Sequence, residues 1–328
     1  MKMKYIPTIS STISPRYLAS FLKEQYGLKD ASCKVIRIGI NHTYLVETDF
    51  EKYILRVYTH NWRSQKEVEG EMELLSWLKN KVSVSYPIRD KNGDYIQKMN
   101  AIEGERFMVL FSYAKGEIVR NPSEKICYTL GLEMAKMHQI TLNKQLPRKD
   151  YNTDSLVGWV HDAVQSHFPT STNELEYIQK AHQLLSDQFK NADYNALKSG
   201  IIHLDLWSQN FKIQNDSMIT LFDFDNCGNG WFFLDIAYAV MLLFKEEPDK
   251  AIFEKKKASF YRGYESILAI SEEEKRLVPY GGLAIWLHYT GIHAIRFNDF
   301  SSLFFSPAYL KAWLQIVNNW MIYNKIEV

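Results

Sequence analysis

Residues 203–210 read His203-Leu204-Asp205-Leu206-Trp207-Ser208-Gln209-Asn210, and this stretch decides the fold. A second polar stretch follows it as Leu221-Phe222-Asp223-Phe224-Asp225. Short apolar and β-branched runs at 201–203, 211–213 and 219–222 flank the two stretches and predict short strands, with an embedded hairpin. The pattern therefore predicts that Asp205, Asn210 and Asp223 lie in loops that short strands hold in place.

Two carboxylates and a carboxamide are the side chains that a phosphoryl-transfer site requires. One Asp accepts or orients the proton of the acceptor hydroxyl, while an Asn and a second Asp supply oxygen ligands to Mg²⁺. Protein kinases place an Asn five residues after the first Asp, which is the spacing of Asp205 and Asn210. A single Asp in a turn usually caps a helix or a loop. The prediction therefore rests on the combination of these residues, with Asp205 as the catalytic residue and Asn210 and Asp223 as metal ligands.

Three further polar residues near these loops have less specific interpretations. We expect His203 to pack behind the loop and to bond the backbone rather than to act as a general base. Asp235 lies in the apolar segment Trp231–Phe244, where a carboxylate is costly unless it accepts hydrogen bonds. It either holds backbone N–H groups of the 203–210 loop or caps a helix. Asp225 is a second metal ligand, a contact to the acceptor, or a turn cap.

The hydrophobic pattern predicts an α+β fold of two lobes. Residues 1–112 form a small lobe with an antiparallel sheet, and residues 113–328 form a larger, mainly helical lobe. Such a pair of lobes favours a ligand cleft between them. The expected strands are 35–38, 44–46, 53–58, 95–97 and 107–111. The expected helices are 15–26, 67–79, 127–139, 174–189 and 233–245, with further helices to the C-terminus.

Composition excludes several classes of protein. The chain has 328 residues with 39 basic and 38 acidic side chains, so its net charge is +1. This balance argues against nucleic-acid binding and against a polybasic membrane surface. The three separated cysteines, Cys33, Cys127 and Cys227, predict reduced thiols rather than disulfides or a zinc site. No apolar run follows the basic N-terminus, and 231–244 is shorter than the ~20 residues that span a bilayer. We expect a cytoplasmic monomer or homodimer.

These motifs resemble the aminoglycoside phosphotransferase and choline kinase family, which has a protein-kinase-like fold. The similarity runs from about residue 15 to about residue 320, and the layout is nearest to the stress response kinase A and type II homoserine kinase branch. The resemblance implies Mg²⁺ and ATP or GTP as cofactors. It also assigns nucleotide-binding positions: strand residue Arg56 with helix partner Glu71, turn residues Gly39 and Asn41, and hinge residues Phe111 and Tyr113.

The sequence departs from the family pattern at three positions. A single glycine stands in the phosphate turn, an Arg replaces the usual strand Lys, and Leu204 stands where Gly is usual. The chain also lacks an Ala-Pro-Glu motif, and the segment between Asp223 and Asp235 is too short for a long activation loop. We therefore expect a phosphotransferase that acts on a small hydroxyl compound such as an amino alcohol, a sugar or an aminoglycoside. The alternatives are a Ser/Thr protein kinase of the stress response kinase A type and a catalytically silent nucleotide-binding scaffold. Most aromatic residues are expected in the core, with a minority lining the acceptor pocket.

Overall fold

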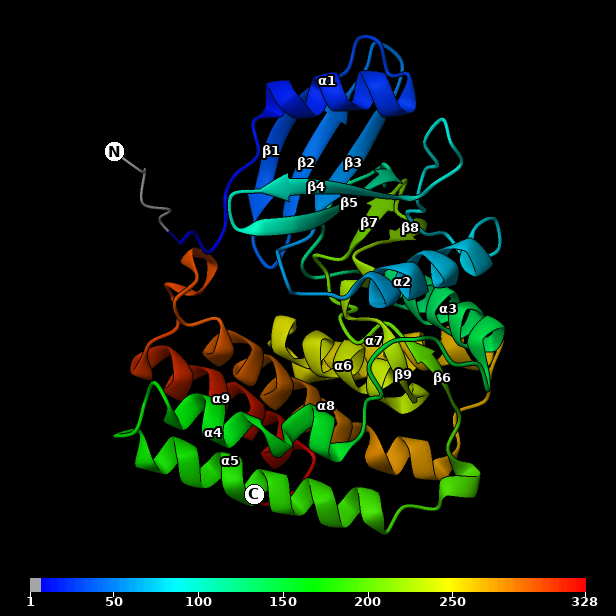
Figure 1. The fold of residues 1–328 in the computed structure, drawn as a ribbon. Helices are drawn as coiled ribbons and strands as arrows, with labels where there is room; N and C mark the ends of the chain where they lie inside the picture. Colours follow the sequence, from blue (N-terminus) through cyan, green and yellow to red (C-terminus); the bar gives the residue numbers. More distant parts are fainter. Residues whose placement is uncertain (1–6) are drawn as a thin grey trace. The chain divides into compact units, whose positions relative to one another are not determined.

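A computed structural model describes residues 7–328 of the chain (Figure 1). The described residues divide into two compact units. The first consists of residues 7–79, 84–114 and 299–301, and the second of 80–83, 115–298 and 302–328. The prediction that no signal peptide is present rests on residues 1–7, and residues 1–6 lie outside the described part.

The first unit is built on a five-stranded antiparallel sheet with the strand order β1-β2-β3-β5-β4. Helix α1 covers one face of it (Figure 1), where buried Leu18 and Leu22 pack against Tyr44, Val46 and Leu55 of the strands. Its elements are α1 (Pro15–Tyr26), β1 (Ser32–Ile38), β2 (His42–Glu47), β3 (Lys52–Val57), α2 (Gln65–Leu78), β4 (Ile96–Ala101) and β5 (Gly104–Ser112).

Local sequence explains where the two helices of this unit begin and end. Pro15 opens α1, and Gly27 ends it in the left-handed conformation at φ 77°. Ser14 precedes the helix at the N-cap position, but its side chain makes no capping hydrogen bond. Helix α2 begins with a capping box in which Ser64 and Glu67 satisfy each other's backbone N–H groups.

The second unit is mainly helical and contains two small antiparallel sheets, β6-β9 and β7-β8. Helix α8 packs against α4, α5 and α6 (Figure 1). The helices are α3 (Glu124–Thr141), α4 (Val160–Gln165), α5 (Thr172–Lys190), α6 (Phe232–Glu246), α7 (Lys250–Glu265), α8 (Glu272–Ile295) and α9 (Pro307–Tyr323). The strands are β6 (Ser199–Ile202), β7 (Phe211–Gln214), β8 (Met218–Leu221) and β9 (Gly228–Trp231). Short single turns of helix cover 154–158, 194–196, 224–226 and 300–302.

Helices α3 and α7 cross at two glycines. A Cβ atom on Gly131 would lie 2.1 Å from the Phe260 carbonyl oxygen, and one on Gly263 would lie 2.0 Å from the Tyr128 carbonyl oxygen. The missing side chains therefore let the two backbones touch, which fixes α3 against α7. Helix α6 is buried over almost its whole length, as its apolar sequence predicts.

The predicted fold class is confirmed: a small antiparallel sheet unit precedes a larger helical unit. Within the described residues, no helix is long and apolar enough to cross a membrane. The three cysteines are free thiols. The expectation that most aromatic side chains lie in the core is wrong, because fewer than half of the described Phe, Tyr and Trp side chains are buried. Trp286 is 1% exposed and its ring stacks on Trp313 with 4.0 Å between ring centroids.

Candidate active site

The β7-β8 hairpin brings Asn210 close to Asp223. Phe211 pairs with Leu221 across the two strands, and beyond that pair the Phe222 N–H donates to the Asn210 carbonyl at 2.9 Å. Asn210 precedes the first strand and Asp223 follows the second. Both residues therefore lie at the open end of one hairpin, although 13 positions separate them in sequence.

Asn210 holds Asp205 directly. Its Nδ2 donates to the Asp205 carbonyl at 2.8 Å and to carboxylate oxygen Oδ2 at 2.9 Å. Asn210 is 1% exposed, so its amide has a fixed direction. Asp205 and Asn210, five positions apart in sequence, are thus the two ends of one loop, and this pair of hydrogen bonds joins them.

His203 links the 203–210 loop to the end of β8. Its Nδ1 accepts from the Asp205 backbone N–H at 3.2 Å, which leaves Nε2 to donate to the Phe222 carbonyl at 3.1 Å. These two bonds define a neutral imidazole, since a proton on Nδ1 would displace the Asp205 N–H. Burial lowers the pKa of His203, in agreement with that protonation state.

Asp235 of α6 holds the backbone of the loop. Its Oδ2 accepts from the His203 N–H at 2.8 Å, and its Oδ1 accepts from the Leu204 N–H at 2.7 Å. His138 of α3 bonds Oδ2 from the other side at 3.0 Å. Asp235 is fully buried, so these donors replace water around its charge. The sequence leaves two roles open for Asp235, holding the loop backbone or capping a helix. The contacts seen here are with the loop backbone.

Two tyrosine hydroxyls contact the loop at Leu204 and Asp205. Leu204 adopts φ 62°, a left-handed conformation that costs a branched side chain about 1–2 kcal/mol. The Tyr289 hydroxyl of α8 has one proton and lies within reach of two acceptors, the Leu204 carbonyl at 3.2 Å and Asp205, and the Tyr238 hydroxyl also hydrogen-bonds to Asp205. Burial and the Asp205 charge raise the pKa of both phenols well above 10, so they remain donors.

Asp225 lies in a short turn that is held by hydrogen bonds with an arginine and a tyrosine side chain. Arg148 donates from Nη2 to the Asp225 carbonyl and from Nε to the Cys227 carbonyl, the latter at 2.8 Å. Asn226 Nδ2 donates to the Tyr289 hydroxyl at 3.1 Å. The same phenol therefore contacts both the 203–210 loop and the turn that contains Asp225, which is 4% exposed.

The donor set around the hairpin fits a magnesium ion that keeps some of its water. Asn210 uses its nitrogen for Asp205, and among the described residues no donor hydrogen-bonds to its Oδ1. No group of three or more His, Cys, Asp or Glu side chains in the described part is arranged to hold a metal. Two protein oxygens, from Asn210 and Asp223, are what Mg²⁺ typically takes when phosphate oxygens and water complete the octahedron.

In the first unit, Arg56 of β3 and Glu71 of α2 form a buried ion pair. Nη1 of Arg56 lies 2.7 Å from Oε1 of Glu71, and their side chains are 10% and 0% exposed. The guanidinium lies 5.0 Å from the Phe111 ring centroid on the neighbouring strand β5. The sheet pairs Arg56 with Val109 and Phe111 with Ile54, so Phe111 is a diagonal neighbour of Arg56. Arg56 and Glu71 contact each other, as the resemblance implied.

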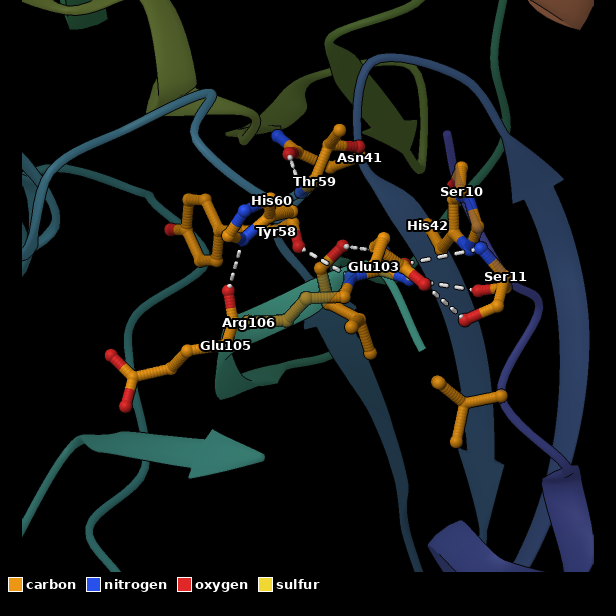
Figure 2. A network of polar contacts seen from close by, with 12 residues as sticks. Ser10, Ser11, Asn41, His42, Tyr58, Thr59, His60, Glu103, Glu105 and Arg106 are labelled. Carbon is orange, nitrogen blue, oxygen red and sulfur yellow. Dashed lines mark hydrogen bonds and ion pairs between the residues drawn. The ribbon is translucent and has the colours of Figure 1, made fainter. Parts of the chain in front are cut away.

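Gly39 and Asn41 form the turn between β1 and β2. The Gly39 N–H donates to the Asn41 carbonyl at 3.2 Å, and the Asn41 side-chain oxygen accepts the Thr59 N–H at 3.2 Å (Figure 2). The Thr59 hydroxyl donates to the Ile40 carbonyl. Asn41 therefore ties the turn to the residues that follow β3.

Phe111 and Tyr113 differ in their backbone environment. The Leu110 carbonyl and the Ser112 N–H bond the segment at 86–88, at 2.8 and 2.9 Å, so the sheet engages this strand up to Ser112. Tyr113 is the first residue after β5. Of the two expected hinge residues, Phe111 therefore lies within the sheet, paired with Ile54, and only Tyr113 lies beyond it.

Sequence reasoning missed four residues that support the site: Tyr58, His138, Arg148 and Tyr238. Three of them, His138, Arg148 and Tyr238, contact site residues that are distant in sequence. Tyr58 lies two positions after Arg56 and contacts both Arg56 and Glu71. Tyr289 is partly exposed, and its hydroxyl contacts the loop. The sequence offers one general indication of such residues. A tyrosine in an apolar segment must place its hydroxyl against a hydrogen-bond partner when it is buried.

These loops and this sheet define the class of the protein, a protein-kinase-like phosphotransferase. Residues 32–270 match the phosphotransferase enzyme family, and the chain belongs to that family. Homoserine kinase from Neisseria meningitidis is 28% identical over 83% of this chain and 86% of its own length.

Solved structures share the fold. A microcompartment-associated aminopropanol kinase aligns with a TM-score of 0.77 at 20% identity, covering 95% of this chain and 99% of its own. Amicoumacin kinase, solved in complex with AMP-PNP, Ca²⁺ and Ami, aligns with a TM-score of 0.73 at 18% identity, covering 94% of this chain and 93% of its own. The resemblance to the phosphotransferase family is confirmed, and with it the assignment of the chain as a kinase-type enzyme.

Proposed function

We propose that the chain is an ATP- and Mg²⁺-dependent kinase that phosphorylates the hydroxyl group of a small amino alcohol. The observation that supports this proposal best is the fixed direction of the Asp205 carboxylate. Asn210 donates a hydrogen bond to it at 2.9 Å, and Asp235 accepts hydrogen bonds from the backbone of the same loop. A carboxylate of fixed direction suits a base that takes a proton from one defined hydroxyl.

In this proposal the second unit supplies the base and the metal ligands. Asp205 accepts the proton of the acceptor hydroxyl as the phosphoryl group transfers. Asn210 through Oδ1 and Asp223 through its carboxylate would hold Mg²⁺, which, when bound, neutralises charge on the phosphate oxygens. His203 stays neutral and orients the loop. Asp225 provides a further carboxylate for metal or for the acceptor.

The first unit supplies nucleotide contacts. Arg56, paired with Glu71, would bind phosphate oxygens through its planar guanidinium. The turn with Gly39 and Asn41 would cover the phosphates, and backbone groups around Phe111 and Tyr113 would receive the base. AMP-PNP and a divalent cation in the amicoumacin kinase structure support this nucleotide and metal.

The amino-alcohol acceptor rests on the relatives. Homoserine and aminopropanol, the compounds after which two of them are named, each have an amine and a hydroxyl on a short chain. The partly exposed carboxylate of Asp205 beside the reacting hydroxyl also favours a cationic neighbour.

The test is an ADP-release assay with Mg·ATP against a panel of acceptors: homoserine, aminopropanol, an aminoglycoside, a sugar and a generic protein. We expect turnover with the amino alcohols. Turnover confined to the protein would replace the proposal with a protein kinase, and nucleotide binding without any transfer would replace it with a silent scaffold.

Asp205→Asn tests the base directly. We expect it to lower kcat by about 10²–10⁴-fold, the usual contribution of general-base catalysis, while calorimetric ATP binding persists. The matched control is Asp216→Asn in the β7-β8 turn, where an exposed Asp has φ 48°, a conformation that Asn also tolerates. Full turnover by Asp205→Asn would remove that residue from the mechanism.

A further inference from the structure

Tyr58 completes the buried ion pair of the first unit. The Tyr58 hydroxyl donates to Oε2 of Glu71 at 2.8 Å, while Arg56 takes Oε1 at 2.7 Å. Nη1 of Arg56 also donates to the Tyr58 hydroxyl oxygen at 3.4 Å. The three side chains therefore form a closed triangle, in which each contacts the other two.

Burial makes this triangle rigid. Glu71 is 0% exposed, and within the described residues its carboxylate receives hydrogen bonds from Arg56 and Tyr58. A buried carboxylate oxygen that loses its donor must find another, because desolvation without a hydrogen bond is costly. Without the phenol, the Glu71 carboxylate would turn, and Arg56 would follow it.

The backbone of Tyr58 is itself held from outside the triangle (Figure 2). Arg106 of β5 donates from Nε to the Tyr58 carbonyl at 2.7 Å and from Nη2 to the Val57 carbonyl at 3.2 Å. The Tyr58 N–H donates to the Phe107 carbonyl at 2.9 Å. These bonds fix the point where the chain leaves β3.

Arg106 is anchored in turn by the N-terminal segment. Its Nη1 donates to the Ser11 carbonyl at 2.8 Å and to Glu103 at 3.1 Å, and the Ser11 hydroxyl donates to the same carboxylate at 2.7 Å (Figure 2). Arg106 is 1% exposed, so little solvent competes for these bonds. A continuous polar network thus runs from Ser11 through Arg106 and Tyr58 to Glu71.

We propose that Tyr58 is a positioning residue that sets the direction of the Arg56 guanidinium, with Arg106 and its partners Ser11 and Glu103 fixing Tyr58. This inference rests on the proposed role of Arg56 in binding nucleotide phosphates. Tyr58 touches neither substrate nor reacting atoms and acts through Glu71 and Arg56.

The first experiment measures Tyr58→Phe, which keeps the ring and removes the hydroxyl. We expect KM for ATP and the calorimetric Kd for AMP-PNP to rise about tenfold, the size of one hydrogen bond to a charged group, with kcat changed less than about threefold. Tyr44→Phe is the matched control. Tyr44 of β2 is as fully buried as Tyr58. Its hydroxyl donates to the Ile13 carbonyl at 3.0 Å and does not take part in the triangle.

The control separates positioning from packing. Both variants should melt at a lower temperature, but only Tyr58→Phe should weaken nucleotide binding. Equal losses of affinity in the two variants, or an unchanged KM in Tyr58→Phe, would overturn the inference.

A second experiment tests whether Tyr58 acts through the ion pair. The background is the double variant Arg56→Met, Glu71→Gln, which removes both charges together and so avoids a lone buried charge. There, adding Tyr58→Phe should change the AMP-PNP affinity less than about twofold, because the pair it orients is gone. A further tenfold loss would show that Tyr58 acts elsewhere. If the wild-type protein bound no nucleotide, the proposed function would fail first and this inference with it.

Discussion

Replacing Asp235 with Asn removes one acceptor from the most buried charge of the second unit. The carboxylate accepts from His203 N–H, Leu204 N–H and His138, at 2.8, 2.7 and 3.0 Å. An amide offers one oxygen, and its NH₂ group would face one of the two backbone donors. That donor is left unsatisfied in a residue with no solvent exposure.

The magnitude follows from these contacts. A hydrogen bond to a charged group contributes about 1.5–3 kcal/mol, and a buried donor without a partner costs about 1–3 kcal/mol. We expect Asp235→Asn to lower the free energy of unfolding by about 3 kcal/mol. Urea denaturation followed by tryptophan fluorescence measures it, and kcat in the ADP-release assay should fall as well, because the loop that holds Asp205 loosens.

Asp249→Asn provides the matched control. Asp249 is exposed and its side chain accepts from two backbone N–H groups, those of Ala251 and Ile252, at the start of α7. Asn caps helices about as well as Asp, so this variant should change stability by less than about 0.5 kcal/mol. A loss of under 1 kcal/mol for Asp235→Asn would refute the reasoning, because it would mean that the loop does not depend on the carboxylate.

Three further perturbations test other parts of the second unit. The hydrogen bond from Lys256 lowers the pKa of Glu247 from 4.5 to about 2, so the stabilisation is present above pH 4.5 and is lost as pH falls toward 2. Glu247→Gln should therefore destabilise the protein at pH 6 and much less at pH 3 in thermal melts; an equal difference at both values would contradict this. Tyr289→Phe removes the hydroxyl that bonds the Leu204 carbonyl, and kcat should fall about tenfold with KM for ATP unchanged in steady-state assays; an unchanged kcat would exclude a role in the loop. Gly131→Ala forces α3 away from α7 and should cost more than about 2 kcal/mol in urea denaturation, and a smaller loss would mean that the helices separate easily.

Local patterns predicted most of the fold. The apolar stripe of Val68, Met72, Leu75 and Leu78 is buried as expected in α2, and the helix after Pro15 ends at Gly27. Tyr17 of the first helix is 53% exposed, whereas Leu18, Phe21, Leu22 and Tyr26 of the same helix pack against the sheet. Periodicity shows which residues can face a core, but the size of that core depends on its partner.

Elements that depend on distant pairing were missed. Strand β9 reads Gly228-Asn229-Gly230-Trp231, which has low strand propensity, yet it pairs with β6. A Cβ on Gly230 would lie 2.6 Å from Ile202, so close packing rather than propensity selects its glycine.

The site divides in the same way. Asp205 and Asn210 belong to one loop and their spacing was visible in the sequence, but the hydrogen bond between them was not predicted. The tyrosines that bond Asp205 come from α6 and α8 and meet it only after folding. Motif spacing can therefore identify site residues that are close together in sequence. The residues that support them from distant helices can be identified only from the tertiary structure.

The left-handed conformation of Leu204 has a consequence for how this sequence can change over evolution. The conformation is imposed from both sides, by Asp235 on the N–H and by Tyr289 on the carbonyl. A lineage with glycine at position 204 needs neither support to the same degree. We therefore expect substitutions of Asp235 or Tyr289 to be tolerated mainly in descendants that first acquire glycine at 204, so that the order of mutations matters at this loop.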